Sequence, residues 1–426
     1  MVRLNHPHRM KLSALTLLLI AIPGTTFGAP TVKYADIEAL KGILPQKTEH
    51  YEIKDPVVIA PPYYNFSIDT KHGPYEIQSI KNLLKVCHEI RVMEEYAKTD
   101  EGDQTWAGAR DTFKSIGSGA KMIVKDPNAA RKAIARSLSK TARSIGRLFN
   151  KASKKTDERK SSEGRNRDIG AGGQLYAKTA RQFAHRMQLD VYTDNPYAQA
   201  LMREVAKQQG AGRAAVGVAT FFLSPIPGLR TITRGSLTSD AINAEAELLI
   251  SDNTPAEMRH QLRKKFIADR KLSSFRNKKE IAEFDAFLAN GNFNPRQEAY
   301  LGLYLTKFKN MDGIRDAIKQ LGEITTETDA DFITSQYELL FAIHSKKTRL
   351  KKLQPIGSII GAVDEAGKLL VAAPFDVVGN TTYLRNLSAE IKEAGDATIL
   401  MLGKPSGSIN GVRTEGSLLK DPALTK

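Results

Sequence analysis

The residues whose types and spacing suggest a chemistry are the basic side chains between positions 131 and 167. This stretch contains 13 Lys and Arg residues against 3 Asp and Glu residues, and its net charge is therefore +10. Six of the basic residues follow one another at steps of three or four, which places them along one face of an α-helix: Lys132, Arg136, Lys140, Arg143, Arg147 and Lys151. The spacing predicts an amphipathic basic helix over residues 131–151.

This predicted helix has two interpretations. Apolar residues fall on its opposite side, among them Ile134, Leu138 and Ile145, so the basic face could be simply solvated while the apolar face packs on a core. Alternatively, the basic face binds a polyanion, such as acidic lipid headgroups, lipopolysaccharide-like phosphates or nucleic acid. Aromatic side chains do not alternate with the charges, which argues against base stacking. We expect no sequence-specific binding of nucleic acid.

The sequence contains no motif for a metal ion or a cofactor, and we predict neither. Paired cysteines and a His-Glu-x-x-His motif are absent. A stretch that resembles a phosphate-binding loop, residues 361–369, has one residue too many between its glycines, and Leu369 stands where a hydroxyl would hold magnesium. Beyond residue 28 the chain has six histidines, of which no two have ligand spacing on one helix: His50, His72, His88, His185, His260 and His344.

Catalytic motifs are equally weak, and the catalytic residues, if any exist, are unknown from the sequence. Two Ser-x-x-Lys matches begin at Ser118 and Ser137, but the companion motifs of serine acyl enzymes are missing. An acidic cluster at a predicted helix start (Glu327, Asp329 and Asp331) is explained by the favourable interaction of negative charge with the helix dipole.

The amino terminus has the three parts of a secretory signal peptide. Arg3, Arg9 and Lys11 precede an uncharged apolar run over residues 12–22, and small residues follow a Pro-Gly break. The run is too short to span a bilayer, which needs roughly 20 apolar residues. We therefore expect an exported protein, periplasmic or extracellular, with no membrane span after processing and with Met1 or Met10 as its start.

Cleavage after Gly28 places small residues in the two positions that the signal peptidase reads. Amino-terminal sequencing of protein recovered from the secretory fraction should therefore begin at Ala29. A membrane-bound product that begins at Met1 or Met10 would contradict this prediction.

Cys87 is the only cysteine, so the chain cannot form an intramolecular disulfide. It falls in an apolar helical stripe with Leu83, Leu84 and Ile90, which indicates a buried small hydrophobic residue rather than a reactive thiol. The stability of the fold must then come from packing.

Hydrophobic periodicity predicts a mainly α protein with a small β element near its C-terminus. Helix starts are indicated by cap-proline pairs at Asn195, Thr254 and Asn294. We divide the chain into a signal peptide (1–28), an irregular segment with at most two short edge strands (29–74), a helical region ending in the basic helix (75–150), a basic flexible linker (151–173), a mainly helical domain with short C-terminal strands (174–402) and a loose tail (403–426).

Three functions remain open from the sequence. The first is a non-enzymatic binding or structural role in the cell envelope or outside the cell, with the basic helix as a polyanion-binding surface. The second is a secreted enzyme of the hydrolase type, whose site is assembled from residues distant in sequence. The third is a membrane-active secreted protein that uses the basic helix together with the apolar segment 214–229, which is otherwise interpreted as a buried core helix.

Overall fold

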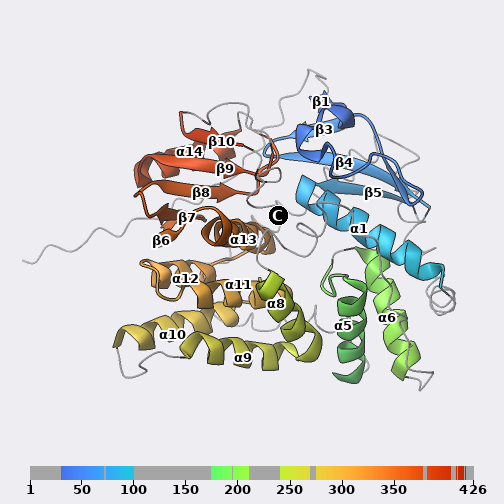
Figure 1. Cartoon of the computed structure of the whole chain (residues 1–426), viewed down its shortest axis with the longest axis horizontal. Helices are drawn as coiled ribbons and strands as arrows, with labels where there is room; N and C mark the ends of the chain where they lie inside the picture. The colour runs from blue at the N-terminus through green and yellow to red at the C-terminus, as the bar shows by residue number, and fades with distance from the viewer. Residues whose placement is uncertain are drawn as a thin grey trace, which may run out of the picture.

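The computed structural model describes residues 30–71, 73–99, 174–193, 195–210, 240–268, 275–377, 381–403, 409, 411–416 and 418. The predicted signal peptide, the predicted basic helix, the predicted linker and the segment 214–229 lie outside these residues. In the described part, two sheets lie side by side at the top of Figure 1, and most of the helices lie below them.

The N-terminal sheet is antiparallel throughout and is built around one long strand. Its strands are β1 (Thr31–Val32), β2 (Tyr51–Ile53), β3 (Val57–Ala60), β4 (Tyr63–Thr70) and β5 (Gly73–Gln78). β4 pairs with β2, β3 and β5, and β1 extends the sheet beyond β3. Two short 3₁₀ turns, Tyr34–Asp36 and Glu38–Leu40, follow β1. Phe66 and Ile68 of β4 are fully buried, and α1 (Ile80–Ala97) packs on this sheet.

Besides α1 and the later α14 (Thr382–Ala394), the helices of the described chain lie mostly below the sheets in Figure 1. They are α5 (Gln174–Met187), α6 (Pro196–Gly210), α8 (Asp240–Asp252), α9 (Pro255–Ile267), α10 (Phe275–Leu288), α11 (Pro295–Phe308), α12 (Ile314–Gly322) and α13 (Glu327–Lys346). α5 packs on α6 and α8, and α11 packs on α8, α9 and α13. None of the described helices is long and apolar enough to cross a membrane.

The C-terminal sheet has the order β10-β9-β8-β7-β6 and mixes two directions. β6 (Leu350–Ile356), β7 (Ile359–Asp364) and β8 (Leu369–Ala373) form an antiparallel meander, whereas β9 (Ala397–Met401) and β10 (Arg413–Glu415) run parallel to β8. α14 (Thr382–Ala394) connects β8 to β9. Alternate residues of β8 enter two different clusters of buried side chains, one shared with α13 and one shared with α14. Helices therefore cover both faces, which explains the continuous apolar sequence of β8.

The predicted mainly α fold is wrong, because two five-stranded sheets make this a mixed α/β fold. The N-terminal segment that we expected to be irregular contains four of the strands. The helix predicted from residue 75 begins only at Ile80, because residues 75–78 belong to β5. Ile77 and Ile80 have helical spacing, but Ile77 is a strand residue paired with Phe66. The apolar pattern of the helix therefore continues into β5, and the spacing alone does not show where the helix begins.

Several helix predictions are confirmed. Thr254 and Asn294 form complete capping boxes with Glu257 and Gln297, and each is followed by proline at the first helical position. The helix that the sequence predicts over residues 329–345 starts two residues earlier, at Glu327, with Thr326 as its cap. The predicted strands at 369–373 and 398–402 correspond to β8 and β9.

Candidate functional site

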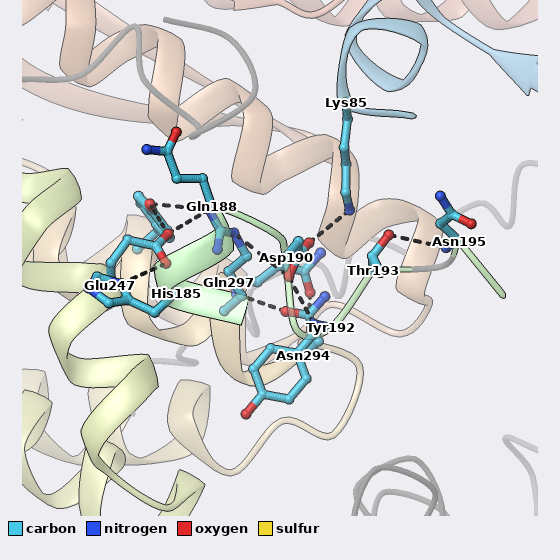
Figure 2. Close-up of polar contacts among 12 residues, drawn as sticks. Lys85, His185, Gln188, Asp190, Tyr192, Thr193, Asn195, Glu247, Asn294 and Gln297 are labelled. Carbon is cyan, nitrogen blue, oxygen red and sulfur yellow. Dashed lines mark hydrogen bonds and ion pairs between the residues drawn. The ribbon is translucent and has the colours of Figure 1, made fainter. Parts of the chain in front are cut away.

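A cluster of buried charges lies where α1 meets the turn between α5 and α6. We call it the Asp190 network, and it consists of Lys85, Glu89, Asp190, Asn195, Glu247, Arg296 and Tyr300. Figure 2 shows Lys85 reaching from α1 toward Asp190 on this turn, with Glu247 and the start of α11 nearby. Four segments far apart in the sequence therefore meet at one point.

Local hydrogen bonds fix the turn that carries Asp190. Gln188 ends α5 with a left-handed φ of 57°, which lets Leu189 N–H donate back to the Ala184 carbonyl at 2.8 Å. The Asp190 carboxylate accepts a hydrogen bond from Tyr192 N–H at 2.9 Å. Asn195 then caps α6 by accepting from Tyr197 N–H at 3.1 Å, as its position before Pro196 predicts.

The charges of the network are closely paired. Lys85 Nζ lies 2.7 Å from Asp190 Oδ2, and Arg296 Nη2 lies 2.7 Å from Glu247 Oε1. Arg296 also approaches Asp190, with Nε 4.0 Å from Oδ1, and the Tyr300 hydroxyl donates to Glu247 at 2.9 Å. Burial alone would raise the pKa of Asp190, but Lys85 and Arg296 outweigh burial and lower this pKa to about 2. Asp190 is therefore ionised at neutral pH.

Glu89 is the least solvated carboxyl of the network, with 1% of the residue exposed. Its Oε2 accepts a hydrogen bond from Asn195 Nδ2 at 3.1 Å. Burial raises the pKa of Glu89 to about 6, although Lys85 acts in the opposite direction. Its neighbour His88 places Nε2 3.2 Å from the Gln188 carbonyl. Lys85, His88 and Glu89 thus have helical i, i+3, i+4 spacing and fasten one face of α1 to the turn.

These contacts hold together the two elements that flank the basic stretch. α1 ends at Ala97 and α5 begins at Gln174, so the basic stretch lies between these two helices in the sequence. The Tyr96 and Phe183 rings pack edge to face at 5.2 Å between these helices. The role that this geometry supports is structural. Ion pairs and a ring contact hold α1 to α5 and its following turn, and residues 131–151 lie between these two helices in the sequence.

Some of the residues that the sequence analysis singled out lie outside the described chain, and the others have structural roles. The six residues of the basic stripe lie outside the described chain: Lys132, Arg136, Lys140, Arg143, Arg147 and Lys151. Residues 361–369 form the β7–β8 hairpin, and Lys368 Nζ lies 3.2 Å from Glu415 Oε1, so this stretch is not a phosphate-binding loop. Cys87 is fully buried, as predicted. Thr326 caps α13 by accepting from Asp329 N–H at 3.1 Å, which gives the acidic cluster a structural role.

Sequence reasoning missed the Asp190 network. The signal that could have found it is the presence of charged residues inside an apolar stripe, since Lys85 and Glu89 alternate with Leu84 and Cys87 on α1. A buried charge requires a partner. The partners, Asp190 and Arg296, belong to other helices and turns, and no spacing along the chain connects them to Lys85.

No protein family model matches the chain, and no curated protein or solved structure shows significant similarity to it.

Proposed function

We propose that this chain is an exported, non-enzymatic protein, periplasmic or extracellular, that binds polyanions through the basic helix of residues 131–151. The observation that carries the proposal is the distribution of charge. Without residues 1–28 the net charge falls from +16 to +13, because Arg3, Arg9 and Lys11 are removed. Residues 131–167 supply +10 of this, so the remainder of the mature chain has a net charge of only +3.

The described fold supports the proposal in one respect. Ion pairs of the Asp190 network and the Tyr96–Phe183 contact hold α1 against the α5–α6 unit. The basic stretch is thereby inserted between two anchored helices of a packed core. Basic residues that are concentrated in one short stretch can act together on a multivalent anion.

Vesicle sedimentation tests the proposal. The mature protein should co-sediment with vesicles that contain acidic phospholipid and should not co-sediment with neutral vesicles. Added salt should weaken binding, because exposed charges are screened beyond roughly 8–10 Å at physiological ionic strength. Changing Arg136, Lys140, Arg143 and Arg147 together to Glu should abolish binding, since each basic residue near an anionic surface contributes about 1 kcal/mol.

A matched control separates the basic stretch from net charge alone. Lys33, Lys264, Lys351 and Lys352 are exposed on the folded part of the chain, and their change to Glu alters the net charge by the same amount. This control variant should bind acidic vesicles as the wild type does. If both variants lose binding equally, or if the reversal of the basic stretch leaves binding unchanged, the proposed surface is wrong.

A further inference from the structure

Two carboxylates and one histidine converge where the turn before β2 meets the last turn of α1. Glu49 and His50 belong to the turn before β2, and Glu95 belongs to the last turn of α1. His50 Nε2 lies 3.3 Å from Glu49 Oε1 and 3.1 Å from Glu95 Oε1. One ligand atom from each of the three side chains lies within 4.8 Å of the other two.

The position of His50 is fixed by its own turn. Thr48 Oγ1 accepts hydrogen bonds from the backbone N–H groups of His50 at 3.1 Å and Tyr51 at 3.2 Å. The ring of His50 is largely buried, with 8% of its side chain exposed, whereas Glu95 and Glu49 are 26% and 68% exposed. The three side chains therefore form a site that is buried at His50 and open to solvent at Glu49.

Two of the three distances between donor atoms fit a tetrahedral metal ion. In a site with bonds of about 2.0–2.1 Å to nitrogen and oxygen, neighbouring ligand atoms are separated by about 3.3 Å. The two measured distances from His50 Nε2, 3.1 and 3.3 Å, agree with that separation. One imidazole and two carboxylates are ligands that zinc accepts, and the open side leaves the fourth position to water.

The place for a cation is taken by an ammonium group in this structure. Lys98 Nζ lies 2.8 Å from Glu95 Oε1 and 3.3 Å from Glu49 Oε1. The side chain of Lys98 is 53% exposed, so it can turn away into solvent. Nearby Lys71 pairs with Glu94, which leaves Lys98 as the cation that a metal ion would replace.

We propose that Glu49, His50 and Glu95 form a binding site for a divalent transition-metal ion of the zinc type, in which the ion displaces the ammonium group of Lys98. The site is independent of the polyanion-binding function. It also departs from the metal-free protein that the sequence predicts. Glu49 and His50 are separated from Glu95 by strands β2 to β5 and most of α1, so no motif along the chain joins the three ligands.

Zinc titration of the untagged mature protein, followed by calorimetry, tests the site. We expect one zinc ion per chain. His50→Ala should weaken zinc binding by more than about 100-fold, and Glu95→Gln by about tenfold or more, because loss of an outer-shell partner alone costs 10–100-fold. Cobalt substitution should give the visible absorption of a tetrahedral site, and His50→Ala should abolish it.

Lys98→Met distinguishes a metal site from an ion-pair cluster. Removal of the competing ammonium group should tighten zinc binding by about tenfold, whereas an ion-pair cluster with no metal function would bind no zinc in either protein. His260→Ala, which removes an exposed histidine on α9, should leave binding unchanged. Should His50→Ala fail to fold by circular dichroism, the Glu95 and Lys98 variants decide.

The proposal is overturned if the wild type does not bind one zinc ion per chain. It is also overturned if folded His50→Ala or Glu95→Gln binds zinc as tightly as the wild type, or if Lys98→Met fails to increase the affinity.

Discussion

Asp190→Ala should lower the free energy of unfolding by about 3–5 kcal/mol, because removal of one partner from a buried ion pair leaves the other charges uncompensated. Without Asp190, Lys85 loses its partner at 2.7 Å, and Tyr192 N–H loses the acceptor that closes the turn. Arg296 keeps Glu247 as its partner, so the loss falls mainly on α1 and the turn. Urea unfolding of the two proteins at pH 7, followed by circular dichroism, measures the difference.

Asp69→Ala is a matched control for this variant. Asp69 pairs with Lys54 at 3.0 Å, but its side chain is 56% exposed, and exposed pairs contribute at most about 1 kcal/mol. Equal losses of stability in the two variants would mean that burial of the Asp190 network contributes nothing.

The pH dependence provides a second measure of Asp190. Its pKa of about 2 lies below the ordinary value of 3.8. A lowered pKa stabilises the folded state above the unfolded pKa, and this stabilisation is lost as the pH falls through the folded pKa. The advantage of wild type over Asp190→Ala should therefore be constant above about pH 5 and shrink by about 2 kcal/mol between pH 5 and pH 2.

The sequence predicted local features well. Thr254, Asn294 and Asn195 could be assigned as helix caps because a cap depends on residues within three positions of itself. Burial of Cys87 followed from the periodicity of a single helix. These predictions succeeded because each depends on interactions within one short segment.

Features that need distant partners were not predictable. β4 pairs with three strands, but its own sequence contains polar residues and follows two prolines, so nothing local identifies it as the centre of a sheet. The Lys85–Asp190 pair joins residues 105 positions apart. The site at His50 depends on where the last turn of α1 lies relative to the turn before β2. Such contacts are set by packing, which spacing along the chain does not record.

Asp376 joins the two sheets through one buried carboxyl group. Its Oδ2 accepts hydrogen bonds from Tyr64 N–H of β4 at 3.1 Å and from Ile80 N–H at the start of α1 at 2.9 Å. The backbone N–H of Asp376 donates to the Pro62 carbonyl at 2.9 Å. A Cβ atom on Gly403 would lie 1.8 Å from the Asp376 carbonyl oxygen, so this close approach requires glycine at position 403.

The ionisation of Asp376 should make the stability of the protein depend on pH near neutrality. Burial raises the pKa of this carboxyl from 3.8 to about 7, against the lowering effect of the two backbone hydrogen bonds. Between pH 4 and pH 7 the folded protein keeps a proton that the unfolded chain releases, so stability falls as the pH rises. Asp376→Asn carries no such proton. The advantage of this variant over the wild type should grow by about 2–3 kcal/mol between pH 5 and pH 8.

Comparison with Asp376→Ala separates the charge of Asp376 from its hydrogen bonds. The Asn side chain keeps an oxygen that can accept hydrogen bonds from Tyr64 N–H and Ile80 N–H. The Ala side chain has no acceptor, so both N–H groups lose this hydrogen bond. Each donor left unsatisfied costs about 1–3 kcal/mol, so Asp376→Ala should be less stable than Asp376→Asn at every pH. Urea unfolding of the three proteins at pH 5, 6, 7 and 8 measures both effects. A difference between wild type and Asp376→Asn that stays constant over this range would show that the carboxyl does not titrate there. In that case the hydrogen bonds alone, and not the proton, join the two sheets.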